Sequence, residues 1–172
     1  DILAGGQPVT RKDSGCTPDG WDWNRLDGTT VVVLEPARLR AVSRGTEFIG
    51  TDEAFCGAAT GAAGNATFAL RLHGAKQHDP SFRARKSYHW FDRLGAFVCL
   101  GSGITSADRD HPVQTTLFQK SLPNPDTPTF VDGTPRTGLG EPAAPDATQW
   151  HWLLDTQGTA YVVPPGQALT LV

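Results

Sequence analysis

Methionine is absent from this chain of 172 residues, and cysteine is scarce. Without a methionine, residue 1 is not an ordinary translation start, so we expect the sequence to be a piece of a longer protein. The three cysteines are Cys16, Cys56 and Cys99, and no Cys-x-x-Cys spacing occurs among them. This spacing argues against a zinc knuckle or a dithiol redox motif. We expect Cys56 and Cys99, which lie inside strand-like runs, to be small core residues rather than a disulfide.

Long apolar runs and helical periodicity are also missing. No stretch is long and apolar enough to cross a bilayer, and no window keeps a 3.6-residue apolar period over the length of a helix. The sequence contains no His-Glu-x-x-His pair, no Gly-x-Ser-x-Gly elbow and no phosphate-binding loop. We therefore expect no metal and no cofactor. A net charge of −3 favours neither a nucleic acid nor a membrane as partner.

Glycine and proline are plentiful, at 19 and 13 residues, and short β-branched runs separate them. This composition predicts an all-β domain with many turns, a large antiparallel β-sandwich. We interpret residues 1–19 as a lead-in or linker and residues 20–172 as the sandwich. The predicted strands are 29–35, 47–49, 54–59, 67–74, 86–91, 97–100, 113–119, 129–131, 150–155, 160–163 and 168–172.

The run 67–74 alternates strictly. Phe68, Leu70 and Leu72 fall on one face of the predicted strand, and Arg71 and His73 fall on the other. A two-residue period is typical of a half-buried strand. Further along the chain, the Gly-Ser-Gly of 101–103 predicts a turn, and the proline- and glycine-rich segment 134–148 predicts a loop.

Charge is unevenly distributed along the chain. Between 71 and 93 six basic residues stand against two acidic ones, whereas after 121 one basic residue stands against five acidic ones. A basic middle and an acidic end suit an anionic ligand held on one side. The alternative is that both segments are ordinary solvated surfaces.

Several segments, in this order, resemble the β-sandwich of the bacterial hyaluronate and chondroitin lyases, especially the chondroitin ABC lyases. The resemblance implies that the sandwich is of the supersandwich kind. The resemblance runs from about Gly20 to Val163. It is carried by Gly20-Trp-Asp-Trp-Asn-Arg-Leu-Asp-Gly-Thr-Thr30, His78-Asp-Pro-Ser-Phe82, Arg83-Ala-Arg-Lys-Ser-Tyr-His-Trp-Phe-Asp92, Phe97-Val-Cys-Leu-Gly-Ser-Gly-Ile-Thr105, Val113-Gln-Thr-Thr-Leu-Phe-Gln119 and Trp152-Leu-Leu-Asp-Thr-Gln-Gly-Thr-Ala-Tyr161.

The resemblance implies an enzyme that cleaves a uronic-acid polysaccharide, such as a glycosaminoglycan, by β-elimination. In that family the Asn or His, the Tyr and the Arg that handle protons come from an α/α-toroid, which would precede Asp1. We therefore expect an N-terminal toroid of the same protein and an acidic polysaccharide as partners. We expect the chain alone to be inactive and the protein to be secreted, extracellular or periplasmic.

The resemblance also implies one acid in the sandwich. In the chondroitin ABC branch, a Glu follows a Phe-x-Gly within a few residues. The matching Phe55-Cys-Gly57 places it at about Ala62, where this sequence has no acid. Glu53 or Glu47 could serve instead, or Glu53 is simply a solvated loop acid. A glycine- and alanine-rich loop can approach a sugar chain closely, but it cannot move protons.

Residues that could bind substrate are Trp21, Trp23, Asn24, Arg25, Arg71 and His73. Trp21 and Trp23 share a face on an extended segment, and so do Trp150 and Trp152. Exposed indoles in such pairs stack on pyranose rings, but large aromatic side chains are more often buried in a core.

The roles of Asn24 and Arg25 are equally open. They could reach a cleft between domains, or tie the lead-in to the sandwich. The paired indoles and the missing acid leave a second hypothesis, in which the chain is a non-catalytic carbohydrate-binding or structural module of an extracellular protein.

Overall fold

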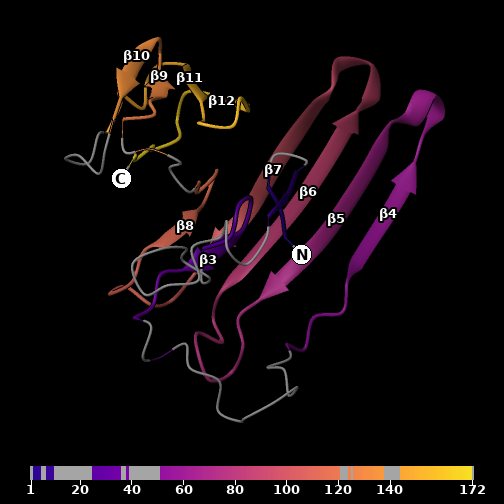
Figure 1. Cartoon of the computed structure of the whole chain (residues 1–172). Helices are drawn as coiled ribbons and strands as arrows, with labels where there is room; N and C mark the ends of the chain where they lie inside the picture. The colour runs from indigo at the N-terminus through magenta and orange to yellow at the C-terminus, as the bar shows by residue number, and fades with distance from the viewer. Residues whose placement is uncertain are drawn as a thin grey trace. The chain divides into compact units, whose positions relative to one another are not determined.

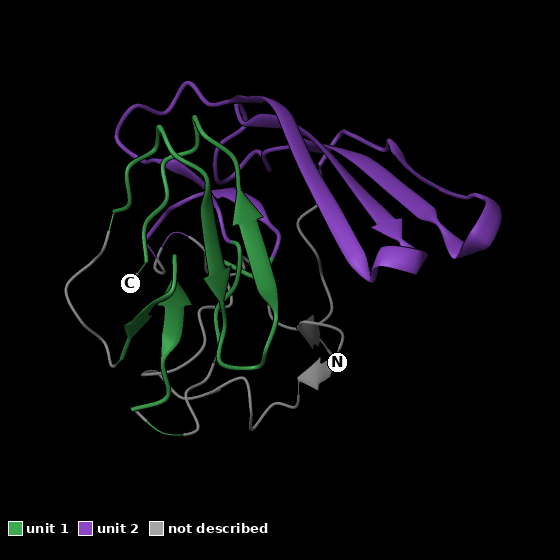
Figure 2. Ribbon diagram, turned by 90° about the horizontal axis from the view of Figure 1, so that it is seen from above, with its two compact units in different colours: residues 1–27, 117–172 green, residues 28–116 purple. Residues whose placement is uncertain are grey.

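The computed structural model describes the backbone of residues 2–4 and 7–9, and residues 25–35, 38, 51–120, 124, 126–137 and 144–171 in full. All regular structure in these ranges is antiparallel strand, apart from two 3₁₀ turns, η1 (Ala62–Gly64) and η2 (Asp92–Leu94). The prediction of an all-β antiparallel fold is thus confirmed. None of the described residues forms a helix that could span a membrane. The chain divides into two compact units, one of residues 1–27 and 117–172 and one of residues 28–116 (Figure 2).

The unit of residues 28–116 is built on a four-stranded meander in which neighbouring strands along the chain are neighbours in the sheet (Figure 1). Its strands are β4 (Cys56–Thr60), β5 (Ala66–His73), β6 (Arg83–Phe91) and β7 (Ala96–Thr105). The residues from 83 to 85 already belong to β6, so this strand begins earlier than predicted.

The register of the meander gives it one apolar and one polar face. Phe68 of β5 pairs with Tyr88 of β6, and Ala66 pairs with Trp90, so these side chains share the apolar face. Arg71 pairs with Arg85, which places both on the opposite face. Successive side chains of a strand point to opposite sides, so Phe68 and Arg71 lie on different faces of β5. This confirms the alternation predicted for 67–74.

A two-stranded sheet of β3 (Thr30–Val32) and β8 (Val113–Thr115) completes this unit. The hydroxyls of Thr30 and Thr115 lie 2.8 Å apart across it. The Tyr88 hydroxyl donates to the carbonyl of Gly28, 3.0 Å away, and so ties the segment before β3 to the apolar face of the meander.

The other unit contains a four-stranded sheet in the order β10-β9-β11-β12. Its strands are β9 (Thr129–Val131), β10 (Thr134–Arg136), β11 (His151–Leu154) and β12 (Ala160–Val163). Val131, Leu153 and Val163 are buried together at its centre, and Leu117, Phe118, Tyr161, Leu169 and Leu171 pack against them. The rings of Phe118 and Tyr161 stack with centroids 4.7 Å apart.

Two predicted irregular segments are strands instead. β10 lies inside the segment predicted as a loop; it is an edge strand, where Pro135 removes no inner hydrogen bond. Within the predicted lead-in, β1 (Ile2–Ala4) and β2 (Gln7–Val9) pair as a short antiparallel hairpin. The strand predicted over 47–49 lies outside the described residues. At the C-terminus a single bridge at Leu171 stands in place of the strand predicted over 168–172.

The predicted turn at 101–103 is also corrected, because this segment lies inside β7. Arg83 pairs with Thr105 and Arg85 pairs with Ser102, so two residues of β7 lie opposite one residue of β6 at this point. Gly103 there has φ +57°, a left-handed conformation that favours glycine. The glycine therefore forms a β-bulge that lets the strand continue.

The two described cysteines are free and exposed, so the prediction that they are core residues is wrong. Cys56 pairs with Leu70 and Cys99 pairs with Tyr88, which puts both on the apolar face of the meander. Along this face the described residues leave large side chains open, since Phe68 is 41 % and Phe97 is 66 % exposed. Cys16 lies outside the described residues.

Candidate functional site

The polar face of β5 and β6 gathers most of the chemistry-bearing side chains of the meander. We define this polar face by Thr67, Arg71, His73, Arg83, Arg85, Ser87 and His89, which the register places on one side of the two strands. Its pairs are Thr67 with His89, Arg71 with Arg85, and His73 with Arg83. Exposed apolar side chains flank it on β7, where Val98 pairs with His89 and Leu100 pairs with Ser87.

Glu53 reaches the end of this face from the segment that leads into β4. Its Oε2 lies 3.3 Å from His73 Nε2 and 3.9 Å from Arg71 Nη1. Its Oε1 accepts a hydrogen bond from the backbone N–H of Phe55, at 2.8 Å. Only 13 % of the Glu53 side chain is exposed, against 55 % for Arg71. The structure therefore brings Glu53 to Arg71 and His73, which the sequence analysis had already placed on one strand face.

Asp52 completes this cluster from the other side of the imidazole. Its Oδ1 lies 2.9 Å from His73 Nδ1, so His73 stands between two carboxylates. The hydrogen bond from His73 lowers the pKa of Asp52 below its usual value. The Arg71 guanidinium also lies over the Phe55 ring, 5.1 Å from its centroid. The cluster therefore presents two carboxyl groups to His73 beside an arginine held over the Phe55 ring.

A hydrogen-bonded row extends the polar face toward the hairpin tips. His89 Nδ1 lies 3.1 Å from the Thr67 hydroxyl, and its Nε2 lies 3.0 Å from the Ser87 hydroxyl. Both ring nitrogens are thus occupied by hydroxyl groups, which can rotate to donate or accept. Such a row can hydrogen-bond to a polar polymer lying along the strands. The sequence analysis did not select His89 or Arg85. Pairing the two predicted strands, 67–74 and 86–91, would have placed His89 on this face, whereas Arg85 lies before the predicted start of the second strand.

The position expected for the acid near Ala62 is a hairpin tip without one. Ala62 belongs to η1, between β4 and β5, and Ala63 there has φ +59°. The carboxylate beside this tip belongs to Asp92 of the neighbouring hairpin, whose backbone N–H donates to Asn65 Oδ1 at 3.1 Å. Asp92 Oδ1 in turn accepts from Trp90 Nε1 at 3.3 Å. The bond from the Asp92 backbone to Asn65 therefore joins the two tips, whereas the Asp92 carboxylate is bonded within its own hairpin.

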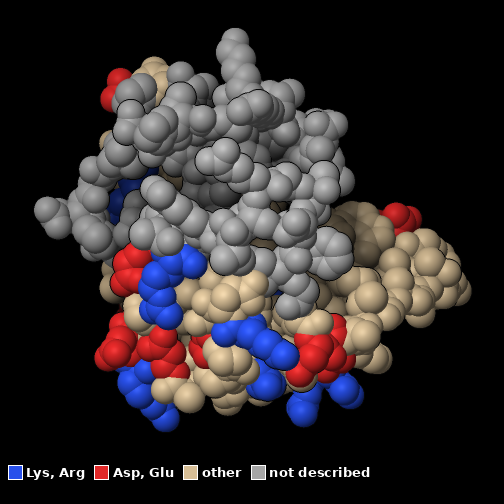
Figure 3. Space-filling model, turned by 90° about the horizontal axis from the view of Figure 1, so that it is seen from below, with Lys and Arg blue, Asp and Glu red and all other residues tan. Residues whose placement is uncertain are grey.

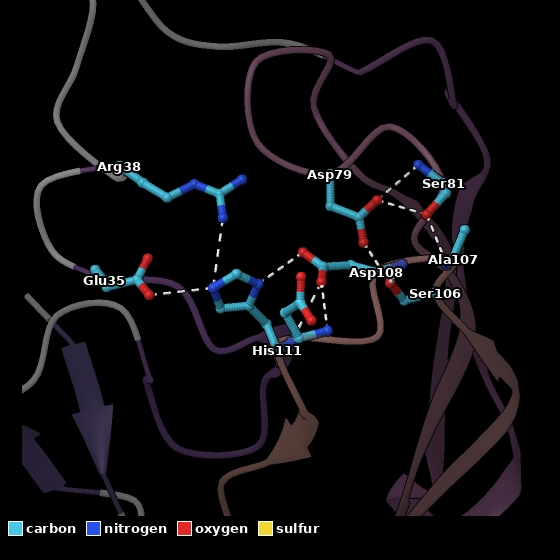
Figure 4. Close-up of polar contacts among 9 residues, drawn as sticks. Glu35, Arg38, Asp79, Ser81, Ser106, Ala107, Asp108 and His111 are labelled. Atoms are coloured by element: carbon cyan, nitrogen blue, oxygen red, sulfur yellow. Dashed lines mark hydrogen bonds and ion pairs between the residues drawn. The ribbon is translucent and has the colours of Figure 1, made fainter.

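A second histidine lies between carboxylates in the same unit (Figure 4). His111 Nδ1 is 2.8 Å from Asp108 Oδ2, and its Nε2 is 3.1 Å from Glu35 Oε1. These hydrogen bonds raise the pKa of His111. The protonated ring donates through both nitrogens. Nε2 therefore cannot accept a hydrogen bond from Arg38 Nη1, although the two atoms lie 3.4 Å apart. The arrangement fastens the 106–112 turn to the end of β3 and leaves no ring nitrogen for acid–base work.

Asp79 makes a comparable fastening in a neighbouring turn (Figure 4). Its Oδ1 accepts from the Ser81 hydroxyl at 2.5 Å, and its Oδ2 accepts from the Ser106 hydroxyl at 2.6 Å. Burial opposes ionisation of Asp79, but the bonds from Ser106 and Ser81 prevail and lower its pKa. Both serine hydroxyls are held by an ionised carboxylate that is a weak base, so neither is activated as a nucleophile.

Trp150 and Trp152 lie on the outer side of the sheet in the other unit. They are 66 % and 45 % exposed, and Val162, the register partner of Trp152, is 67 % exposed. The alternate residues His151 and Leu153 are buried, so they point inward. The interpretation that these two indoles fill the core is therefore wrong, because the inward positions of β11 are occupied by His151 and Leu153.

Four of the residues singled out in the sequence, Trp21, Trp23, Asn24 and Glu47, lie outside the described residues. Arg25 is described, and its backbone carbonyl accepts from Gln119 Nε2 at 2.8 Å. This bond ties the segment to the strand-like run that follows β8. The proposed roles of these residues in substrate binding stay predictions.

Charge on the visible part of one face is mixed, with basic and acidic side chains in adjoining groups (Figure 3). Among the described residues, no three His, Cys, Asp or Glu side chains converge in a way that could hold a metal ion.

The described strands form antiparallel sheets only, so the chain is an all-β domain, and one face of its meander carries arginine and histidine side chains. The sequence profile described as "Polysaccharide lyase family 8, super-sandwich domain" matches residues 18–172, and this chain belongs to that family.

Curated relatives agree with this assignment. The chain is 38 % identical over 124 residues to the chondroitin sulfate ABC exolyase of Bacteroides thetaiotaomicron, which covers 68 % of this chain and 12 % of the relative. It is 39 % identical over 123 residues to the corresponding exolyase of Proteus vulgaris, which covers 67 % and 12 %. It is 29 % identical over 178 residues to the chondroitin sulfate ABC endolyase of Proteus vulgaris, which covers 99 % and 16 %. The chain thus spans less than a fifth of the length of these relatives.

Proposed function

We propose that this chain is the β-sandwich part of a lyase that cleaves a uronic-acid polysaccharide of the chondroitin type by β-elimination. In this reaction a base removes the C5 proton next to the uronate carboxylate. The glycosidic C–O bond at C4 then breaks, a C4–C5 double bond forms, and an acid protonates the leaving oxygen. The chain supports the substrate cleft, and an N-terminal α/α-toroid of the same protein supplies the residues that move protons.

Membership of the polysaccharide lyase family carries this proposal. The relatives named for chondroitin sulfate lyases support the choice of an acidic substrate. The polar face supports a binding role for this chain, because Arg71 is both exposed and held in position by Glu53 and Phe55. A positioned guanidinium matches the two oxygens of a carboxylate, and holding it in advance limits the entropy lost on binding.

The size of such a substrate also bears on the cellular location of the protein. Polysaccharides of this kind do not enter the cytoplasm intact, so the protein acts as a secreted, extracellular or periplasmic enzyme. Fractionating the source cells and detecting the chain in the medium or periplasm tests this part of the proposal. Finding it only in the cytoplasm would contradict it.

The decisive experiment compares this chain alone with the same chain joined to the helical region encoded upstream of it. Both are assayed on chondroitin sulfate, hyaluronan, a heparin-type polymer and alginate, by the ultraviolet absorbance of the unsaturated uronate product. We expect the longer protein to produce it from chondroitin sulfate and the chain alone to produce none. A longer protein that is folded yet inactive on all four polymers would refute the lyase proposal.

Arg71 supplies a sharper test within the longer protein. Replacing Arg71 with alanine should raise KM for chondroitin sulfate more than it lowers kcat, because the residue binds substrate without moving protons. Lys76→Ala is the matched control, since Lys76 is an exposed cation in the turn after β5. Equal effects of the two substitutions on KM would show that Arg71 does not contact the substrate.

The exposed indoles favour a second candidate function, a non-catalytic carbohydrate-binding module. Trp150 and Trp152 project from one side of β11, as pyranose-stacking residues do. Affinity electrophoresis of the chain in gels containing neutral or acidic polysaccharides distinguishes the two functions. A module of this kind would be retarded by a neutral glycan, and the double substitution Trp150→Ala, Trp152→Ala would abolish the retardation. Leu94→Ala, at another exposed apolar residue, is the control.

A further inference from the structure

Lys120 is a buried cation that lies between two carboxylates in the unit of residues 1–27 and 117–172. Its Nζ is 2.9 Å from Asp27 Oδ2 and 3.8 Å from Asp155 Oδ2. The side chains of Lys120 and Asp155 are 3 % and 0 % exposed, and that of Asp27 is 16 % exposed. An amine and a carboxyl group therefore meet in a place that is nearly closed to solvent, with a second carboxyl group beside them.

A backbone contact fixes the Asp27 carboxyl group against this amine. Asp27 Oδ1 accepts a hydrogen bond from the backbone N–H of Gln119 at 2.8 Å, while Oδ2 faces Lys120. A donor at this distance also stabilises the negative charge that an oxygen gains when a nucleophile adds to its carbon. Reacting groups that are held this close and well oriented reach effective concentrations on the order of 10⁵ M or more. The pair therefore has the geometry that amide formation requires.

Asp155 is held by other donors and keeps one oxygen toward the same amine. Its Oδ1 accepts from the backbone N–H groups of Gln157 and Thr159, at 2.9 and 2.8 Å. Its Oδ2 accepts from the Tyr161 hydroxyl at 3.0 Å and faces Lys120 Nζ. A carboxylate in this place can take a proton from the nitrogen and return it to an oxygen. Asp155 is the more distant of the two acids, which suits a proton carrier rather than the reacting group.

One ammonium between two carboxylates leaves a net negative charge in a nearly closed site. Removing charges from water costs free energy that an ion pair recovers only in part. Joining Lys120 to Asp27 as an amide removes two of the three charges and releases one water molecule. The exposed part of the Asp27 side chain gives that molecule a way out. Burial therefore favours the amide over the separate ions more than bulk water does.

We propose that Lys120 and Asp27 condense spontaneously to an isopeptide bond, with Asp155 as the proton carrier. Lys120 Nζ first gives one proton to Asp27 Oδ2, which leaves a neutral amine and a neutral acid. The nitrogen lone pair then adds to Asp27 Cγ, and a second Nζ proton passes to Asp155. Asp155 returns this proton to the departing hydroxyl, so the C–O bond breaks and water leaves. The product is an Nζ–Cγ amide, and it forms whether or not the longer protein is a lyase.

Intact-mass spectrometry of the purified chain, reduced and denatured, tests for this bond. We expect nearly all molecules of the unmodified chain to be one water molecule lighter than the sequence requires. Trypsin does not cut after a lysine that is joined through Nζ, so digestion should give a branched peptide of residues 26–38 and 110–136. A chain with its full sequence mass, or a loss of water located at other residues, would refute the proposal.

Three variants test the part that each group plays. Lys120→Arg keeps a cation between the carboxylates but has no nucleophilic amine, so it should have its full sequence mass. Asp155→Asn keeps an acceptor for the backbone donors but cannot carry the proton, so it should also lack the bond. Lys76→Ala is the matched control, because Lys76 is an exposed lysine in the turn after β5. It should lose one water molecule, as the unmodified chain does.

The variants also provide outcomes that overturn the assignment. A water molecule lost from Lys120→Arg would place the reaction at another residue. Complete bond formation in Asp155→Asn would remove Asp155 as the proton carrier. Far-ultraviolet circular dichroism checks that each variant is folded. The mass of the unmodified chain decides whether the bond exists even where a variant does not fold.

Discussion

His151 Nδ1 lies 2.6 Å from Asp132 Oδ2, and its Nε2 lies 2.7 Å from the backbone carbonyl oxygen of Asp146. Both ring nitrogens therefore face acceptors, which only the doubly protonated ring can satisfy. The bond to Asp132 raises the pKa of His151, and the same bond lowers the pKa of Asp132. Asp132 Oδ1 also accepts from the backbone N–H of Trp152, at 2.9 Å. The buried imidazolium thus fastens the β9–β10 turn to β11.

This ion pair predicts a stability that declines in mildly alkaline solution. The folded-state pKa of His151 lies above its unfolded value of about 6.5, so the stabilisation is complete below that pH and is lost as pH rises through the folded-state pKa. For Asp132 the folded-state pKa is depressed, so its contribution is present above about pH 3.9 and is lost only in stronger acid. Urea unfolding across this range should show the free energy of unfolding falling above about pH 6.5.

His151→Gln isolates the contribution of this ring from that of His111, whose pKa is raised as well. The variant should be less stable than the unmodified chain in mild acid, and the difference should shrink as the pH rises. His78→Gln is the control, because the His78 side chain makes no hydrogen bond within the described residues. A constant difference between His151→Gln and the unmodified chain at every pH would show that the ring is neutral in the folded protein.

The chain has only two tyrosines, and their hydroxyls offer a matched comparison. The Tyr161 hydroxyl donates to Asp155 Oδ2 at 3.0 Å, whereas the Tyr88 hydroxyl donates to the neutral carbonyl of Gly28 at the same distance. Burial and then the charge of Asp155 raise the pKa of Tyr161, and Lys120 Nζ lies 3.8 Å from the same carboxylate oxygen. Removing a bond to a buried charge costs more than removing a neutral bond.

We therefore predict that Tyr161→Phe lowers the free energy of unfolding by about 2 kcal/mol and Tyr88→Phe by about 1 kcal/mol. Chemical denaturation at neutral pH measures both. The stacking of the Tyr161 ring on Phe118 is kept in the phenylalanine variant, so the difference reports the hydroxyl. Equal losses, or a larger loss at Tyr88, would mean that Asp155 is satisfied without Tyr161.

Local alternation was sufficient to predict one part of the candidate site. The two-residue period of 67–73 placed Arg71 and His73 on one face, and the structure agrees. The same period predicted that Trp150 and Trp152 share a face but not which face that is. His151 is buried and bonded to Asp132, which is distant in the sequence, and Leu153 is buried beside it, so the indoles point outward. A pattern that equates large aromatic residues with the core cannot anticipate buried polar partners.

Non-local features account for the other differences. Glu53 meets Arg71 because the segment before β4 passes the end of β5, a path that no local pattern encodes. The glycines of 101–103 predicted a turn, whereas pairing with β6 carries β7 through them by a bulge at Gly103. The Glu53–Arg71 contact and the bulge at Gly103 both depend on which strands are neighbours in the sheet. The order of strands in a sheet cannot be read directly from a single sequence.

Lys86 is a buried cation on the apolar face of the meander, and it provides a prediction of increased stability. Only 5 % of the residue is exposed, and no carboxylate pairs with it among the described residues. Burial disfavours the charged form and lowers the pKa of Lys86. Its Nζ lies 5.9 Å from the Tyr88 ring centroid, at the outer limit of a cation–π contact. That contact offsets only part of the cost of removing the charge from water.

Replacing Lys86 with methionine keeps the length of the side chain and removes its charge. We expect the free energy of unfolding to rise by roughly 1–2 kcal/mol, as when other buried charges are replaced by apolar groups of similar volume. Lys76→Met, at an exposed lysine in the turn after β5, should change it by less than about 0.5 kcal/mol. A loss of stability in Lys86→Met would show that the ammonium has a stabilising partner.

Gly74 ends β5 directly after His73, and the chain turns so tightly there that a side chain does not fit. A Cβ on Gly74 would lie 1.7 Å from the backbone oxygen of Asp79 and 3.1 Å from the Cβ of Phe82. The Gly74 N–H also donates to the Phe82 carbonyl at 3.0 Å. An alanine would have to displace the backbone of a turn whose Asp79 and Phe82 are both buried.

Gly74→Ala should therefore cost about 2 kcal/mol or more of the free energy of unfolding, in the range of an overpacked buried site. Gly57→Ala on β4 is the matched control, since nothing lies within 4 Å of a Cβ there. Because alanine has less backbone freedom to lose than glycine, that change should be neutral or stabilise the chain slightly. Urea denaturation of both variants gives the comparison, and a Gly74→Ala chain as stable as Gly57→Ala would mean that the turn after β5 is wider than the structure describes.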